Sequence, residues 1–289
     1  MSYPAISIIV ITYNNFEELK LTLSSLDNKT LGKEGLCEVI VVNGGTCKMS
    51  QKFLQELCAL HGDVFILVQG PDEGIADAFN KGVMRARGKY ITFLNSGDVL
   101  IEKSYYRWAD KFFNENPNVD FVHGDMIFTD SLCGNMQISP RMYALGRGMP
   151  YHHLTMIVRR SVFQRVGLFN LKYKVAMDFE FVCRMEKIKF KGKYFGPIPI
   201  VMMDGKGISA TREFLAIKEC CCAIREVKGL SCDEFYYLLQ RAFWLFSRKF
   251  LPYIGLKRIL IHLKKQKNKK IIERNKKQQR DTTICNFPL

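Results

Sequence analysis

Hydrophobic and polar positions follow two periods along the first 130 residues. Short runs rich in Ile and Val lack polar alternation and predict buried strands at 6–12, 38–42, 64–68 and 90–94. Between them, apolar residues recur every three or four positions, which predicts helices at 16–26, 51–60 and 75–86. Continuous apolar strands separated by helices indicate an α/β fold with a mostly parallel sheet and helices on both faces.

The pattern after residue 100 is less regular. It predicts a helix at 105–113, a strand at 120–128, an irregular excursion at 132–150, helices at 161–166 and 178–187, and a turn at 196–199. After residue 207 the pattern is wholly helical. We therefore expect three parts: an α/β domain at 1–210, a helical region at 211–265 and a basic tail at 266–289.

Polar residues follow each of the first four predicted strands, and the four clusters lie at 12–14, 43–46, 70–74 and 95–98. Any one of them is an ordinary turn in composition. The carboxyl ends of parallel strands meet at one edge of a sheet, where ligands of open α/β folds bind. Four clusters together predict a ligand site at that edge.

At these positions the chain resembles the family 2 glycosyltransferases, inverting enzymes with the GT-A (Rossmann-like) fold. The matching motifs are T-Y-N at 12–14, V-V-N-G-G at 41–45, P-D-x-G-I-x-D-A-x-N-K-G at 71–82 and A-x-G-x-Y-I-x-F-L-N-S-G-D at 86–98. R-R-S at 159–161, G-x-F at 167–169 and D-F-E at 178–180 follow, so the resemblance covers about residues 4 to 210. It implies transfer of one sugar from a nucleotide-sugar donor to a hydroxyl of a lipid-linked or oligosaccharide acceptor. Capsule, O-antigen or exopolysaccharide biosynthesis is the implied setting.

The resemblance also implies which residues bind the donor. They are Thr12, Tyr13, Asn14, Asn43, Gly44, Asp72, Gly74, Asp77, Asn80, Lys81, Asn95 and Ser96. Tyr13 is expected to stack on the base. Asn43 stands where many members have Asp, so it keeps an acceptor and gains a donor.

A divalent cation, Mg²⁺ or Mn²⁺, is the cofactor that the resemblance implies. The family pattern after the fourth strand is commonly D-x-D-D, and here it is N-S-G-D, which leaves Asp98 as the metal-ligand candidate. A hard cation held by one carboxylate, substrate phosphates and water is chemically workable.

Inversion needs one carboxylate to take the proton of the acceptor hydroxyl. Asp178 matches the acidic motif and is the expected base, with Glu180 in reserve. On a helix these two positions point about 200° apart, so both cannot face the acceptor. An alternative role for Asp178 is to cap the helix. His152 is expected near the donor phosphate or the acceptor, against the alternative of a buried structural histidine.

The formal net charge of +15 is concentrated near the C-terminus. Residues 241–280 hold 14 of the 43 Lys and Arg residues and 1 of the 28 Asp and Glu residues. The segment 233–249 combines a narrow polar stripe with a wide aromatic face. This composition favours a helix lying in the interface of an anionic membrane, with packing on the catalytic domain or in a homodimer as the alternative.

Ten cysteines without a C-x-x-C pair are typical of reduced thiols, and no run of about 18 uncharged apolar residues is present. We therefore expect a cytoplasmic protein, peripheral at the inner face of the cell membrane. Two other functions stay open: a non-catalytic member of the family, and nucleic-acid binding through the basic tail, which would leave the four polar clusters unexplained.

Overall fold

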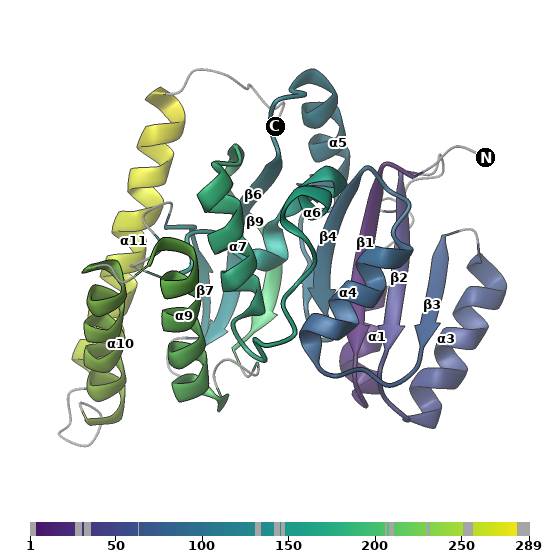
Figure 1. The fold of residues 1–289 in the computed structure, drawn as a ribbon, viewed down its shortest axis with the longest axis horizontal. Coiled ribbons are helices and arrows are strands. Elements are labelled where there is room, and N and C mark those ends of the chain that lie inside the picture. The colour runs from purple at the N-terminus through teal and green to yellow at the C-terminus, as the bar shows by residue number, and fades with distance from the viewer. Residues whose placement is uncertain are drawn as a thin grey trace.

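The computed structural model describes residues 4–26, 31, 36–62, 64–130, 134–141, 145, 148–205, 207, 211–229, 232–250 and 257–281. These residues form a nine-stranded sheet in the order β3-β2-β1-β4-β8-β6-β9-β5, with β7 paired to β6 (Figure 1). Helices cover both faces of its first half, as expected for the α/β class.

The first half of the sheet is parallel. Its strands are β3 (Phe65–Gln69), β2 (Cys37–Asn43), β1 (Ile6–Thr12) and β4 (Tyr90–Asn95). Every residue of β1 and β2 is buried, because their alternate side chains enter two separate cores. One core contains α4 (Ile75–Arg85), and the other contains α1 (Phe16–Ser25) and α3 (Lys48–His61). Continuous apolar strands therefore follow from coverage on both faces.

The second half of the sheet is mixed. β8 (Ile157–Arg159) runs antiparallel to β4 and to β6 (Phe121–Asp130), and β9 (Gly192–Asp204) runs parallel to β6. The short β5 (Val99–Leu100) pairs antiparallel with β9, and β7 (Gly134–Ile138) pairs antiparallel with β6.

Two expectations about this half were wrong. Residues 196–199, expected as a turn, lie inside β9, where pairing with β6 jumps from His123–Tyr194 to Asp125–Pro199 and the residues between bulge out. The excursion at 132–150 contains β7, which has few apolar residues and gains its order from pairing with β6.

Helices make up most of the remaining chain. They are α5 (Tyr105–Glu115), α6 (Arg160–Val166), α7 (Met177–Ile188), α9 (Glu213–Lys228), α10 (Cys232–Phe250) and α11 (Lys257–Asp281), with a 3-10 turn at His153–Thr155. α9 packs on α7, α10 on α9 and α11 on β9 (Figure 1). The packing of α9 on α7 and of α11 on β9 joins the expected α/β domain to the chain after residue 210. The division into three parts stays a prediction. Among the described residues, no helix has the length and apolar character to cross a membrane.

Candidate active site

The four polar clusters start at nearly the same level of the sheet. Thr12 of β1 pairs with Asn43 of β2, which pairs with Gln69 of β3, and Ile11 pairs with Asn95 of β4. Neighbouring strands lie about 4.8 Å apart, so the rim from β3 to β4 spans about 14 Å. The register therefore places the loops that follow these strands along one edge.

Asn14 joins the first two loops. Its Oδ1 accepts hydrogen bonds from the backbone N–H of Thr46 (2.8 Å) and Cys47 (2.9 Å), where α3 begins. Asn14 has a φ of 55°, a left-handed conformation that Asn tolerates better than most residues. Thr12 is buried and donates to Asn15, whereas Tyr13 is 68% exposed. The Tyr13 ring is therefore exposed at this edge of the sheet, whereas the Thr12 and Asn14 side chains bind the protein.

Asn43 is fully buried, and its side chain forms hydrogen bonds within the protein. Its Nδ2 donates to Oε1 of Gln69 (3.0 Å), and its Oδ1 accepts the N–H of Gly45 (3.0 Å). Beside it, a Cβ on Gly44 would lie 1.7 Å from Oδ2 of Asp72. A glycine at position 44 thus lets the Asp72 carboxylate lie over the β2 loop.

Polar side chains of the motif at 71–82 mostly form hydrogen bonds and an ion pair within the β3–α4 loop and α4. Asp72 Oδ1 accepts the N–H of Gly74, whose φ is 117°. Asp77 accepts the N–H of Glu73 (3.0 Å) and pairs with Lys81 (2.8 Å). Burial raises the pKa of Asp77, but the hydrogen bonds from Lys81 and Glu73 outweigh it and lower that pKa. Lys81 and Asp77 thereby hold the loop that carries Asp72.

Asn80 links this motif to a distant segment. Its Nδ2 donates to the carbonyl of Phe169 and its Oδ1 accepts the Phe169 N–H, both at 2.9 Å. Asn80 is 6% exposed, so its amide is buried and ties α4 to residue 169.

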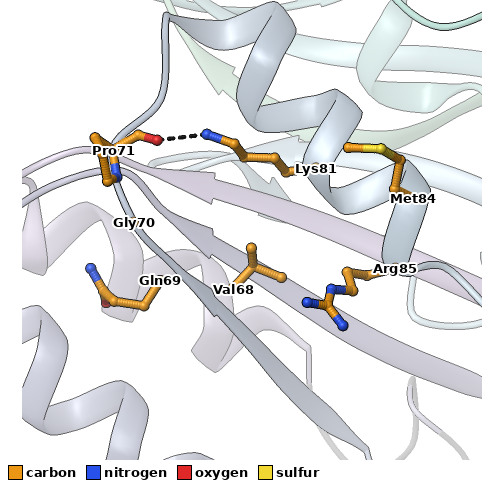
Figure 2. A pocket seen from close by; sticks show the side chains of 7 residues that line it. All are labelled: Val68, Gln69, Gly70, Pro71, Lys81, Met84 and Arg85. Carbon is orange, nitrogen blue, oxygen red and sulfur yellow. Dashed lines mark hydrogen bonds between the residues drawn. The ribbon is translucent and has the colours of Figure 1, made fainter.

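A cavity of about 420 Å³ lies beside the β3–α4 loop. Figure 2 shows the residues that line it: Val68, Gln69, Gly70, Pro71, Lys81, Met84 and Arg85. Two of these lining residues are joined directly, since Lys81 donates to the Pro71 carbonyl (2.6 Å). Gly70 and Pro71 belong to the third polar cluster, and Lys81 is the only expected donor residue among these lining residues, so the cavity lies beside the β3 end of the rim.

Asp98 closes the loop after β4. Its Oδ2 accepts hydrogen bonds from the backbone N–H (2.7 Å) and Nδ2 (3.0 Å) of Asn95, and Ser96 donates to the carbonyl of Ile11 (2.9 Å). Burial raises the pKa of Asp98 to about 7, although the Asn95 hydrogen bonds oppose that rise.

Asp98 is compatible with a cation only if other ligands complete the shell. Among the described residues no group of three or more His, Cys, Asp or Glu side chains could hold a metal ion. The donor set here is one carboxylate, with Asn95 as its neighbour, and Mg²⁺ is held in this way when substrate phosphates and water supply the other ligands.

Asp178 lies in the first turn of α7 and is half-buried. Its Oδ1 accepts the N–H of Phe179 (2.7 Å). Lys174, just before α7, donates to the carbonyl of Glu73 (3.2 Å), which connects the segment before Asp178 to the β3–α4 loop. The candidate base and the candidate donor loop therefore belong to segments in direct contact.

The two histidines at 152 and 153 lie in different surroundings. Burial lowers the pKa of His153, and the nearby Asp178 carboxylate opposes that shift. Its ring stacks on Phe93, with centroids 5.2 Å apart. His152 instead lies against residues 138 and 139, and burial lowers its pKa to about 4. Of the two, His153 is the neighbour of Asp178, whereas the expectation had favoured His152.

Glu180 is committed to another partner. It is 4% exposed and binds Arg184 through both carboxylate oxygens, at 2.8 and 2.9 Å. Arg184 also donates to the carbonyls of Val166 and Leu168, so this pair fastens α7 to the loop after α6. The expectation that Asp178 and Glu180 point to different sides agrees with this arrangement.

Glu219 of α9, which lies in none of the matching motifs, binds the segment just before the candidate base. It accepts hydrogen bonds from the backbone N–H groups of Lys174 (2.9 Å), Val175 (2.9 Å) and Ala176 (2.8 Å), just before α7. In the sequence, the one feature that could have pointed to Glu219 is its spacing of seven residues from Glu226, which places both glutamates on one face of a helix.

The profile of "Glycosyl transferase family 2" matches residues 7–172, more than half of the chain. The chain belongs to glycosyltransferase family 2. It is a glycosyltransferase with the GT-A fold, which confirms the resemblance read from the motifs.

Two curated relatives show how far the similarity extends. The chain is 28% identical over 187 residues to "PGL/p-HBAD biosynthesis glycosyltransferase" of Mycobacterium bovis, covering 64% of this chain and 70% of the relative. It is 24% identical over 207 residues to an uncharacterized glycosyltransferase of Haemophilus influenzae, covering 66% of this chain and 63% of the relative.

Solved structures share the fold at low identity. Staphylococcus aureus TarS 1-349 in complex with UDP superimposes with a TM-score of 0.60 and 16% identity, covering 98% of this chain and 94% of that one. The chain covers 43% of a longer TarS chain. The mannosyltransferase PcManGT from Pyrobaculum calidifontis, in complex with GDP-Man and Mn²⁺, has a TM-score of 0.58 and 15% identity, with 89% and 74% covered.

Proposed function

We propose that this glycosyltransferase moves one sugar, with inversion, from a nucleotide-sugar donor at the β1–β4 rim to an acceptor hydroxyl that Asp178 deprotonates. The observation that carries the proposal is the convergence of the four loops at one sheet edge, together with the contact between Lys174 and Glu73. TarS 1-349 is solved with UDP-GlcNAc and PcManGT with GDP-Man, which supports a nucleotide sugar as the donor class.

In the proposed reaction, a carboxylate oxygen of Asp178 takes the proton of the acceptor hydroxyl. The acceptor oxygen forms a bond to the anomeric carbon while the bond from that carbon to the diphosphate breaks on the opposite face. The electron pair leaves with the nucleoside diphosphate, and the anomeric configuration is inverted. Among the described residues, Oδ2 of Asp178 makes no hydrogen bond, so it remains available for the proton.

Asp98, with Asn95 beside it, is proposed to hold a divalent cation, Mg²⁺ or Mn²⁺, against the donor diphosphate. When bound, the cation would offset the negative charge that develops on the leaving group. Tyr13 is exposed for stacking on the base, and Asp72 and Ser96 are half-buried at the rim.

The acceptor is proposed to be lipid-linked or an oligosaccharide of a surface polysaccharide, and the enzyme to act at the inner face of the cell membrane. What supports this is α10, which exposes its apolar side. Phe235, Leu239, Phe243 and Phe246 are 52–73% exposed and occupy an arc of about 80° on the helix. The opposite side carries Tyr237, which is buried against Phe179 and α9.

Basic residues accompany this apolar face. α11 carries exposed Lys and Arg side chains at 258, 265, 267, 269, 270, 274 and 276. An apolar face with nearby basic residues fits a bilayer containing anionic lipid, since each base near such a surface adds about 1 kcal/mol. A second copy of the same basic chain would meet like charge at this face.

Replacement of Asp178 by Asn tests the proposed base. We expect kcat to fall by about 10²- to 10⁴-fold, because the amide cannot accept the hydroxyl proton, with the donor dissociation constant unchanged. Glu115→Gln, on an exposed face of α5, is the control and should keep wild-type kcat. Transfer by Asp178→Asn at the wild-type rate would remove the base assignment.

A thermal-shift panel of UDP-, GDP-, dTDP- and CMP-sugars, with and without Mn²⁺, tests donor binding. A donor that binds the native state raises its Tm by mass action. A shift that requires Mn²⁺ and disappears in Asp98→Asn supports the cation site. If no donor changes the Tm, the chain is better described as a non-catalytic member of its family.

A further inference from the structure

Glu219 holds the backbone that leads into the first turn of α7. Its carboxylate is 8% exposed and accepts three consecutive N–H groups, from residues 174, 175 and 176, at 2.8–2.9 Å. Ala176 is the N-cap of α7 and has no side chain that could cap the helix. Glu219 therefore satisfies the N–H of Ala176, which α7 leaves unpaired, and the N–H groups of the two residues before it.

A second glutamate of α9 holds the same segment from its other end. Glu226 accepts hydrogen bonds from Tyr173 Oη (2.8 Å) and Lys172 Nζ (2.6 Å). Positions 219 and 226 are seven residues apart and so lie on one side of the helix. The segment 172–176 is thus bound to α9 along its whole length. Of the two glutamates, Glu219 binds its backbone and Glu226 binds its side chains.

The Glu219 hydrogen bonds stabilise this backbone strongly, because the acceptor is charged and the donors are buried. Val175 and Ala176 are buried, and an N–H group left unpaired inside a protein is costly. Hydrogen bonds to a carboxylate are shorter and stronger than those between neutral groups. The position of residue 176 is therefore set by α9, and Asp178 follows two residues later within the same helical turn.

We propose that Glu219 is a positioning residue, which fixes the start of α7 so that the Asp178 carboxylate meets the acceptor hydroxyl. The inference rests on the proposed function of Asp178 as the base. Glu219 touches neither the donor rim nor the acceptor in this scheme, and its effect on transfer passes through the backbone of residues 174–176.

Glu219→Gln is the first test, because glutamine has the same shape but one acceptor oxygen fewer and no charge. We expect kcat to fall by about 10- to 100-fold, the effect of a displacement of about 1 Å in a reacting group. The donor dissociation constant should stay at the wild-type value, because other contacts hold the rim loops. Glu219→Asp keeps the charge but shortens the side chain by one methylene, so it should lower kcat in the same way.

Glu226→Gln is the matched control. It changes the same helix face and the same segment but leaves the N–H groups of residues 174–176 paired. We expect kcat within about twofold of wild type, and a donor-induced Tm shift in every variant shows that it is folded. Wild-type kcat in Glu219→Gln and Glu219→Asp, or an equal fall in Glu226→Gln, would overturn the inference.

A double variant separates this inference from the proposed base. If Glu219 acts through Asp178, adding Glu219→Gln to Asp178→Asn should change the residual rate by less than about twofold. A further fall of 10-fold or more would mean that Glu219 acts by another route. Wild-type activity in Asp178→Asn alone would instead reject the proposed function, whatever Glu219 does.

Discussion

Asn14 and Asn80 each use a side-chain amide to join segments that lie far apart in the sequence. Asn14 binds the backbone of residues 46 and 47, and Asn80 binds that of residue 169. Both belong to motifs that the resemblance connects with the donor. At the residue scale, motif membership thus indicates a candidate site, whereas the contacts of each side chain show which residues support the fold around it.

Replacement of Gly44 by Ala is a prediction at this scale. The added Cβ would lie 1.7 Å from Oδ2 of Asp72, so the Asp72 carboxylate must rotate away. We expect the donor dissociation constant to rise about 10-fold, equivalent to one lost hydrogen bond to a charged group, as measured by titration calorimetry.

Asp72→Ala is the reference for this prediction. It removes both the clash and the carboxylate, so Gly44→Ala combined with Asp72→Ala should bind the donor as Asp72→Ala does. A double variant clearly weaker than Asp72→Ala would show that Gly44 matters for a reason other than the Asp72 carboxylate.

At the scale of elements, buried histidines belong to the second half of the sheet. His123 of β6 is 2% exposed, and its Nδ1 has no hydrogen-bond partner among the described residues. Burial, with a smaller contribution from neighbouring His152, lowers the pKa of His123 to about 3. The rings of Phe121, Tyr151 and Tyr194 surround it.

This burial predicts that the fold weakens in acid. An unfolded histidine has a pKa near 6.5, so below that pH the unfolded state binds a proton that folded His123 does not. The free energy of unfolding should fall by up to about 1.4 kcal/mol per pH unit between pH 6 and 4 for this group.

Denaturant titrations of His123→Phe from pH 7 to 4 check this prediction. Phe fits the aromatic surroundings and cannot be protonated, so the dependence of unfolding free energy on pH should be shallower than in wild type. His61→Asn, on the exposed surface of α3, should keep the wild-type dependence. Equal slopes in His123→Phe and wild type would contradict the prediction.

At the scale of the whole molecule, charge and apolar surface are unevenly distributed. The α3 and α10 helices lie at opposite ends of the molecule, and α11 runs along the α10 end (Figure 1). Most of the net charge of +15 therefore resides at the end that also exposes the aromatic face of α10.

Vesicle flotation tests the proposed membrane contact. Wild type should bind phosphatidylcholine vesicles that contain anionic phosphatidylglycerol, and binding should weaken as salt is raised from about 0.1 to 1 M, where screening shortens to about 3 Å. Joint replacement of Phe235, Phe243 and Phe246 by Ser should reduce binding at least 10-fold, because the apolar face is lost.

Leu21→Ser combined with Leu60→Ser is the control, since both side chains are exposed on α1 and α3. It should float like wild type. A wild-type protein that stays off the vesicles would reject the membrane contact. If the triple replacement instead converts a dimer to a monomer in light scattering, the face joins two copies, and if the tail binds nucleic acid more strongly than vesicles, the basic charge serves that partner.

The sequence by itself determined the elements whose pattern is local. Strands β1 to β4 and most helices follow from apolar runs and helical spacing, because burial on both faces leaves a strong signal. The order of the motifs determined the family. β7, β8 and the bulged β9 escaped prediction because their order comes from pairing with distant strands, and their residues show no strong period.

Tertiary structure alone decided what each polar residue does. Three residues of the motifs use their side chains for hydrogen bonds within the protein: Asn43, Asn80 and Glu180. Glu219 belongs to no motif and binds the backbone just before Asp178. Tertiary structure also decided which side of α10 faces out. The physical reason is that hydrogen-bond partners and burial depend on residues that come into contact only after folding. The hydrophobic pattern along the sequence does not show which distant residues these are.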